Sequence, residues 1–459
     1  MIAKKIQQIN TFTLFAILFG IMGFCFNCYT YYPGFISPDS LDQYTQAYNH
    51  QYTDWHPPIM AAFWSLLLHF HKGGALLFLI QLFVYWLSSV IFFLTALKHF
   101  KRWSWLVPLL FLMPYLQNFV GNLWKDIGLA ISWLLAIVVM VNANYEKRKL
   151  TLFETLLCFV LLCYGCWIRI NALPGVLPLL GIWIYMKSDS NENTLKTKQL
   201  FRKIFIYGLL VIGIQIFITQ VFLKPEKLYP ECKLFCHDLS GIYKESGDLM
   251  FPSFIKEYDG FEAQYIREHY IYSTFDNIWW NKDHKQLDPF FDEGQMQSLR
   301  NCWLKAILKH PLIYLKNRSL GFLQFLRITS SGSKLTISYQ YIHPNDFGLH
   351  YNSNEAAEAI TAYVESQRGM PYMQPWFWLF MNLIILFFAH RRKFGQNNFI
   401  ILCLAYSSLL YIALEFIVFQ ADTEFRYFYW NCLAMSLAII LAIVSRTKKL
   451  QSTEPVHQA

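Results

Sequence analysis

Charged side chains are scarce in this chain. Asp, Glu, Lys and Arg together make up 15% of the 459 residues, whereas apolar residues make up 55% and aromatic residues 18%. A typical soluble domain carries about 25% charged residues, so this composition argues against a soluble protein and indicates a membrane protein. The net charge of +9 is concentrated in short loops. Because the chain has no basic helix and no RNA-type aromatic motif, we expect no nucleic-acid partner.

Several common catalytic motifs are also missing. The sequence contains no P-loop, no G-x-S-x-G and no H-E-x-x-H, which argues against the enzyme classes that depend on them. Its Ser-Gly and Gly-Gly pairs are turn signals. No internal repeat and no low-complexity run is present.

Cysteines are rare in the polar part of the chain. Most of the ten lie in apolar segments, where a cysteine behaves as a small hydrophobic residue. Cys232, Cys236 and Cys302 are the exceptions. The spacing of the first two permits a local disulfide if the segment lies outside the cytoplasm. His237 is adjacent, but a zinc site needs more ligands at suitable spacing.

Long apolar runs dominate what is present. A membrane-spanning helix needs about 20 mainly apolar residues, and the sequence predicts an all-α polytopic protein with about ten such helices. The run 59–70 is too short to cross, so it predicts a helix lying at the interface. The expected spans are 11–29, 75–97, 103–119, 127–141, 152–168, 173–186, 204–223, 375–389, 399–419 and 427–444.

Basic residues predict the orientation of these spans. With the N-terminus inside, every strongly basic short loop falls on the cytoplasmic side, and both termini are cytoplasmic. The start MIAKKIQQIN, followed by an apolar run without a cleavage site, is typical of an uncleaved signal anchor. The basic loop residues are Lys4, Lys5, Lys98, Lys101, Arg102, Lys147, Arg148, Lys149, Lys187, Lys196, Lys198, Arg202, Lys203, Arg391, Arg392, Lys393, Arg446, Lys448 and Lys449.

The spans divide the chain into three parts. Residues 1–223 form an N-terminal membrane module whose first outer loop covers 30–74. Residues 224–373 form an extracytoplasmic segment long enough for a small domain, in which 312–328 is expected to be a helix on the membrane surface. Residues 374–459 supply the last spans and a cytoplasmic tail.

This topology gathers ionisable residues on the outer side. Each has a simple structural interpretation: Asp39 is a candidate helix N-cap, Pro57-Pro58 would begin a helix at Ile59, and Asp126 suits a helix N-terminus. Arginines at span ends commonly extend to the interface. The candidate site residues are Asp39, Asp54, His56, Asp126, Arg169 and Arg426.

The first outer loop also carries a resemblance to a family. An acid directly after the first span, a run of aromatics and then Trp55-His56-Pro57-Pro58 resemble the first outer loop of the GT-C glycosyltransferases, such as aminoarabinose transferases and protein O-mannosyltransferases. The aminoarabinose transferases have E-K-P-P here, so the charged pair is not reproduced. The resemblance covers about the first half of the chain, and Glu424 to Tyr427 (E-x-R-Y) resembles a stretch near the family's last spans.

The resemblance implies a function. Asp39 matches the family's catalytic base or metal-proximal carboxylate, which leaves a divalent metal ion open as a cofactor. Asp54, His56, Asp126, Arg169 and Arg426 would bind substrate, the arginines by contacting a lipid phosphate. The expected function is transfer of a sugar, with inversion, from a polyprenyl-phosphate carrier to a lipid or envelope glycan such as lipopolysaccharide, at the outer face of a bacterial inner membrane.

Two other classes of function share the many spans. A lipid or polysaccharide flippase or transporter is one. Proton coupling usually requires ionisable residues deep in the membrane, and the expected spans contain few. An O-antigen polymerase or ligase is the other, and charge placement does not separate it from a glycosyltransferase.

Overall fold

The regular structure of the chain is helical. The computed structural model describes residues 11–187, 197–258, 260–279, 291–329, 336–418 and 424–451, and within these ranges strand pairing is limited to isolated bridges. Lys4, Lys5 and Lys196 lie outside them. Six of the described helices are long and apolar enough to cross a membrane, namely α1 (Thr11–Tyr31), α4 (Ala75–His99), α7 (Lys125–Tyr145), α10 (Thr197–Phe217) with its π-helical end Ile218–Leu223, α19 (Asn398–Val418) and α20 (Tyr429–Gln451). The chain is therefore a helical membrane protein.

Four shorter apolar helices also lie where apolar runs predict them. They are α3 (Ile59–Leu68), α8 (Leu152–Trp167), α9 (Leu173–Lys187) and α18 (Pro375–His390). At ten residues, α3 is about 15 Å long and too short to span a membrane. Its start at Ile59, directly after Pro57-Pro58, is as predicted.

The expected span 103–119 is wrong as a single helix. It consists of two short helices, α5 (Leu106–Phe111) and α6 (Pro114–Gln117). Pro114 has no backbone N–H and disfavours helical backbone at the residue before it. Met113 is accordingly extended, with φ −64° and ψ 138°. The chain therefore bends at Met113 and restarts a helix with Pro114 in its first turn.

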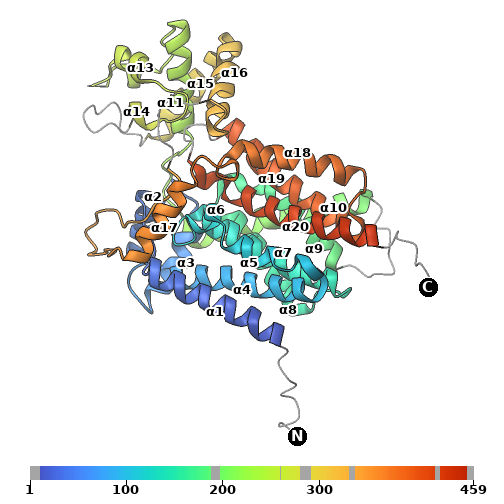
Figure 1. The fold of residues 1–459 in the computed structure, drawn as a ribbon. Coiled ribbons are helices and arrows are strands. Elements are labelled where there is room, and N and C mark those ends of the chain that lie inside the picture. Colours follow the sequence, from blue (N-terminus) through green and yellow to red (C-terminus); the bar gives the residue numbers. More distant parts are fainter. Residues whose placement is uncertain are drawn as a thin grey trace, which may run out of the picture.

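Helix α7 forms the centre of the bundle, packed between α4, α8 and α20 (Figure 1). Nearly all of its side chains from Ile127 to Val141 are buried. Trp133 in its middle donates from Nε1 to the carbonyl of Leu162 at 3.0 Å. A Cβ atom on Gly165 would lie 2.4 Å from this indole, so glycine is needed where α8 crosses Trp133.

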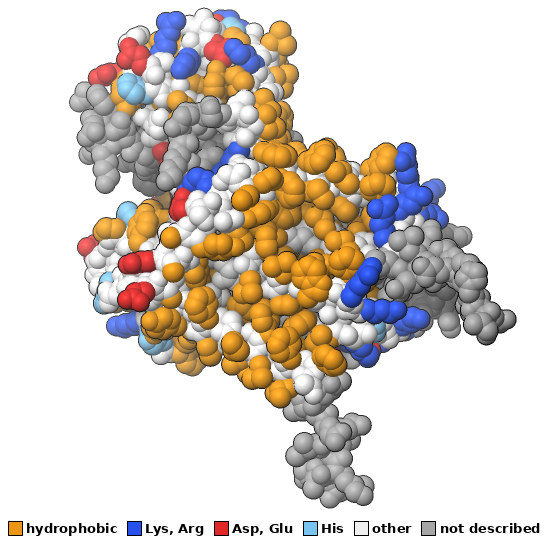
Figure 2. Space-filling model, in the orientation of Figure 1, with side chains coloured by type: hydrophobic (Ala, Val, Ile, Leu, Met, Phe, Trp, Pro, Cys, Tyr) orange, Lys and Arg blue, Asp and Glu red, His pale blue; other side chains and the backbone are white. Residues whose placement is uncertain are grey.

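The two ends of the bundle differ in charge. At one end Lys98 of α4 pairs with Glu146 at 2.8 Å, and Asn397 bonds the hydroxyl of Tyr145 at 2.6 Å. Figure 2 shows Lys and Arg side chains gathered at this end, where α20 ends, and hydrophobic side chains over the visible face of the bundle. The opposite end carries α2 (Pro38–Asn49) and α3 (Figure 1).

Residues beyond α10 form a small helical unit with its own core. Side chains of α11 (Cys232–Ser246), α15 (Glu293–Lys309) and α16 (Pro311–Phe325) build this core, together with short helices α12 (Ser253–Lys256), α13 (Ala263–His269) and α14 (Asp276–Trp279). The unit projects to one side of the bundle (Figure 1).

The following segment, 336–373, packs on the bundle itself. Its backbone pairs with the chain just after α1: His343 N donates to the carbonyl of Ile36 at 2.8 Å. Asn122 donates to the carbonyl of Tyr339 at 3.0 Å. With α17 (Glu355–Ser366), this segment covers the end of the bundle that carries α2 and α3, and its bond to Ile36 lies just before the start of α2.

Cys232 and Cys236 lie one turn apart on α11, both are buried, and no disulfide joins them. Side chains four residues apart on a helix have Cβ atoms about 5–6 Å apart, whereas a disulfide requires about 3.5–4.5 Å. The local disulfide that the spacing permits is therefore not formed, because both cysteines lie in regular helix.

We predict that these two thiols stay reduced in native membranes. Alkylation of the denatured protein without reductant, followed by mass spectrometry, should modify Cys232, Cys236 and the half-buried Cys302 alike. A peptide in which the first two escape alkylation until reductant is added would contradict the helical geometry of α11.

Candidate functional site

Asp39 lies in the first turn of α2, and Ser37 is the N-cap of that helix. The Ser37 hydroxyl accepts from the backbone N–H of Ser40 at 3.3 Å and from Trp124 Nε1 at 2.6 Å. The expected capping role of Asp39 is therefore wrong, since Ser37 performs it. The carboxylate of Asp39 is left to make contacts outside its own helix.

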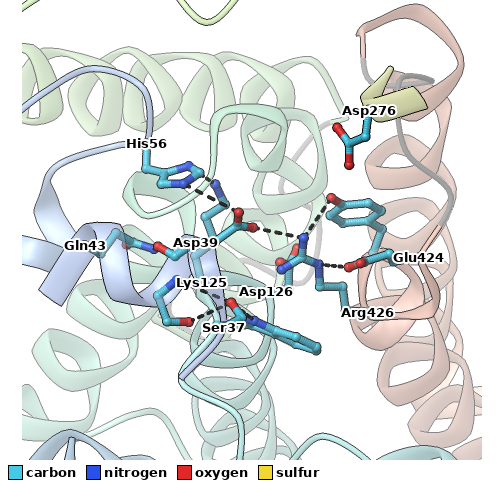
Figure 3. A network of polar contacts seen from close by, with 12 residues as sticks. Ser37, Asp39, Gln43, His56, Lys125, Asp126, Asp276, Glu424 and Arg426 are labelled. Carbon is cyan, nitrogen blue, oxygen red and sulfur yellow. Dashed lines mark hydrogen bonds and ion pairs between the residues drawn. The ribbon is translucent and has the colours of Figure 1, made fainter. Parts of the chain in front are cut away.

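Arg426 binds that carboxylate from the far end of the sequence. Its Nη2 lies 2.9 Å from Asp39 Oδ2, and its Nε contacts the carboxylate of Glu424 (Figure 3). The guanidinium lies over the rings of Trp124, at 4.6 Å, and Tyr427, at 5.1 Å. Arg426 is buried, whereas the Asp39 side chain is 36% exposed.

His56 and Lys125 flank the other oxygen of Asp39. Lys125 Nζ lies 2.6 Å from His56 Nδ1, and His56 Nε2 lies 3.9 Å from Asp39 Oδ1 (Figure 3). An ammonium group only donates, so Nδ1 accepts and the imidazole proton is on Nε2. The neutral ring therefore presents an N–H toward Asp39, at a separation too long for a direct hydrogen bond.

Nearby positive charges lower the pKa values of both Asp39 and His56. Burial alone would raise the pKa of Asp39, but Arg426 and Lys125 more than offset it, and the pKa lies well below its usual range. Burial and the charge of Lys125 lower the pKa of His56 from 6.5 to about 3. Asp39 is thus ionised and His56 neutral at physiological pH.

A second network lies behind the first. Asp126, in the first turn of α7, forms a buried ion pair with Arg169, and Arg169 Nη2 also lies 3.2 Å from Glu415 Oε1. Asn171 donates to the same Glu415 oxygen. The Arg169 guanidinium lies 4.6 Å from the ring of Tyr427, which also contacts Arg426. The two networks therefore share an aromatic side chain.

The small helical unit adds a third charged pair. Lys233 of α11 lies 3.4 Å from Asp276 of α14, and Figure 3 shows Asp276 beside the cluster. The positive charge of Lys233 contributes to the low pKa of Asp39. The unit therefore faces the site.

Asp54 lies outside the cluster. Its carboxylate accepts the backbone N–H of Leu228 at 2.6 Å, and its own N–H donates to the carbonyl of Glu226 at 2.9 Å. Tyr52 and Thr53 pair with the same strand-like segment. We therefore interpret Asp54 as a structural residue that joins the segment before α3 to the segment after α10.

The structure thus joins five of the six predicted residues in two adjacent networks and adds partners that sequence reasoning missed. Lys125 is the main omission. It is the first residue of α7, where a positive charge opposes the helix dipole. A lysine at this unfavourable position indicates that its side chain is used for a contact outside the helix, and sequence reasoning could have noticed this.

These residues do not fit a divalent metal. In the described part of the chain, no group of three or more His, Cys, Asp or Glu residues has the arrangement of a metal site. The groups nearest Asp39 include the cations Arg426 and Lys125, which repel a metal ion. The neutral His56 ring has its Nδ1 already occupied by Lys125. We derive no step through a metal.

The chain was compared with protein-family models, curated proteins and solved structures, and none of them matches. The interpretation of the site therefore rests on its geometry and on the resemblance in the first outer loop.

We predict that Lys125→Met raises the pKa of His56. Without the ammonium group, protonation of the ring costs less, so His56 should gain its proton at a higher pH as the pH falls. A pH titration of ¹⁵N-histidine signals by NMR would measure this, with the His56 signal assigned from its loss in His56→Gln.

Lys72→Met is the matched control, because Lys72 is exposed and lies over the Tyr48 ring. It should leave the His56 titration unchanged. Equal His56 pKa values in wild type and Lys125→Met would contradict the Lys125 contact.

Proposed function

We propose that this protein is a membrane glycosyltransferase that takes a sugar from a polyprenyl-phosphate carrier and transfers it to a lipid or glycan acceptor of the cell envelope. One observation carries the proposal. The ionised, partly exposed carboxylate of Asp39 lies against buried Arg426, beside Lys125 and neutral His56, at the end of the membrane bundle opposite the basic loops.

This arrangement supplies the two groups that the reaction requires. A carboxylate accepts the proton of an acceptor hydroxyl as its oxygen bonds to the anomeric carbon. The bond from that carbon to the phosphate oxygen breaks at the same time, and its electron pair stays on the phosphate. Arg426 stabilises the charge that grows there, and attack opposite the leaving phosphate inverts the anomeric centre.

The low pKa of Asp39 has a role in this proposal. While Arg426 binds the carboxylate, Asp39 is a weak base. A donor phosphate that binds Arg426 competes with Asp39 for the guanidinium and raises the pKa of the carboxyl group toward its ordinary value. Donor binding thereby activates the base.

Among the arginines we assign the phosphate to Arg426 and not to Arg169. The Arg169 side chain is 5% exposed and already contacts Asp126 and Glu415. These two carboxylates are 1% and 2% exposed, whereas Asp39 and Glu424, the partners of Arg426, are 36% and 34% exposed. A phosphate therefore has access to Arg426 and not to Arg169, and we assign the Arg169 network to support of the site.

The proposal includes ten membrane crossings with both termini in the cytoplasm of a bacterial cell. The short helices α5 and α6 would complete one crossing, which is tolerable because they are largely buried in the bundle. The basic residues then face the cytoplasm. The site and the small unit face the opposite side.

The flippase or transporter alternative expects acids near the membrane midplane. Asp126 and Glu415 are buried, but they lie near the site-facing ends of α7 and α19. The polymerase or ligase alternative differs only in the group transferred. Product analysis separates it, because a polymerase or ligase changes chain length or attachment, whereas the proposed enzyme adds one sugar.

We predict that Asp39→Asn reduces sugar transfer by roughly 10²–10⁴-fold, the usual contribution of a general base. Asparagine has similar size and does not take up a proton. The measurement compares envelope glycans of cells lacking the protein with cells that express wild type or variant, by mass spectrometry over time after induction.

Asp42→Asn is the matched control one turn along α2. The Asp42 carboxylate accepts from Gln46 at 2.8 Å and does not face Arg426 in the described contacts, so this variant should keep most activity. Wild-type transfer by Asp39→Asn would remove the proposed base. A glycan profile that does not change when the protein is deleted would contradict the glycosyltransferase proposal itself.

The topology predicts which positions a membrane-impermeant thiol reagent reaches in spheroplasts. Single cysteines at Asn49, Lys147 and Glu257, all exposed, would be tested with Cys25, Cys28 and Cys302 changed to serine. Positions 49 and 257 should be labelled, and position 147 only after the membrane is opened. Labelling of position 147 in closed spheroplasts would invert the proposed orientation.

A further inference from the structure

A stripe of exposed leucines runs along α15 and α16 in the small helical unit. Leu304 is 46% exposed, Leu308 81%, Leu312 79% and Leu315 50%. Leu304 and Leu308 lie one turn apart on α15, and Leu312 and Leu315 lie one turn apart on α16. The two pairs flank the break between these helices at His310. The opposite faces of these helices supply Leu299, Ala306 and neighbouring residues to the core of the unit, so the stripe is additional to that core.

The stripe continues into the wall of the membrane bundle. Further along α16, Phe322 packs on Phe416 of α19 with ring centroids 5.4 Å apart. The adjacent helix α18 exposes Phe380, Leu383 and Phe387, as a lipid-facing helix does. Figure 2 shows hydrophobic side chains along this edge of the unit that continue onto the face of the bundle.

The orientation of α16 suits a membrane surface. In Figure 1, α16 runs across the direction of α18 and α20, and the unit extends beyond α18 to one side of the bundle. Bundle helices that cross a membrane lie near its normal, so α16 lies near its plane. Helix α16 forms one edge of the small unit. Helices α18 and α20 extend away from the site on the same side as this edge, and lipid surrounds the bundle there.

Charged residues flank the stripe as expected for an interfacial helix. Lys309 pairs with Asp248 at 2.8 Å, and Lys316 pairs with Glu245 at 2.7 Å, both at exposed positions. Lys305 is exposed beside Leu304 and Leu308. These ammonium groups reach the level at which lipid phosphates lie while the leucines extend further in.

We propose that the α15–α16 face is a membrane-docking surface, with the leucine stripe inserted at the boundary between headgroups and acyl chains of the outer leaflet. The occupant is lipid and not a second protein copy, because the stripe is continuous with the lipid-facing wall of the bundle. Docking holds the small unit, and with it Lys233 and Asp276, at a constant height over the site. The proposal does not depend on the reaction catalysed.

Spin-label accessibility tests this proposal on the full chain. Single nitroxide-labelled cysteines would be placed at Leu308 and Leu312, with Gln264 on α13 as the exposed control away from the α15–α16 face. The background has serine at Cys25, Cys28 and Cys302, the cysteines that are not buried. The protein is held in nanodiscs of phosphatidylglycerol and phosphatidylethanolamine that contain one copy each.

Molecular oxygen partitions into lipid and a nickel chelate stays in water, so their collision rates report depth. At 308 and 312 the ratio of oxygen to nickel collisions should be several-fold higher than at 264. Equal ratios at the three positions would overturn the proposal. So would a high ratio that appears only when two copies share a nanodisc, because that result assigns the face to a protein contact.

Glutamate substitution supplies a second measurement that needs no label. Leu308→Glu with Leu312→Glu should increase amide hydrogen exchange in α15 and α16 of the nanodisc-bound protein, while exchange in α7 stays unchanged. Unchanged exchange in α15 and α16 would contradict docking.

Discussion

The ion pair between Arg426 and Asp39 is the contact on which the site depends. A guanidinium buried at the end of a membrane bundle is stable only when carboxylates and aromatic faces replace its water. Arg426 has Asp39 and Glu424 as anions and Trp124 and Tyr427 as ring partners. Because these residues come from α2, the N-cap of α7 and the short turn just before α20, the pair joins distant parts of the chain at one point.

The second network, in which Arg169 contacts Asp126 and Glu415, reduces the repulsion between two neighbouring arginines. Arg169 and Arg426 both lie against Tyr427, and two bare guanidinium groups at that separation would repel each other in a poorly solvated region. Asp126 and Glu415 neutralise Arg169 from behind. The charge of Arg169 therefore does not repel the guanidinium of Arg426, which faces the partly exposed carboxylate of Asp39.

Periodicity and charge predicted much of the fold, since apolar runs place most membrane helices within a few residues of their observed bounds. The prediction was wrong where proline decides the backbone, as at Pro114, and where two residues compete for one role, as Ser37 and Asp39 do for the N-cap. Both errors are local, because the length and hydropathy of an apolar run do not predict the backbone angles of one residue or a single hydrogen bond.

The site was predictable only in part for a different reason. Sequence reasoning placed Asp39, Arg169 and Arg426 on one side of the membrane, but which carboxylate pairs with which arginine depends on how helices pack. Lys125 was not among the predicted site residues, yet it determines the tautomer of His56. Contacts between α2 and α7, or between α7 and α19, leave no pattern within either segment.

The pairing also orders the events of the proposed reaction. Binding free energies are reciprocal, so a phosphate that weakens the Arg426–Asp39 contact binds less tightly by the free energy needed to displace Asp39. In return, the base becomes competent only when a donor is present. A permanently free carboxylate beside a sugar phosphate would also activate water, whereas a carboxylate held by Arg426 until the donor binds confines base catalysis to the occupied site. In the proposed reaction, weaker donor binding is therefore the necessary consequence of keeping the partly exposed Asp39 carboxylate unreactive until the donor is present.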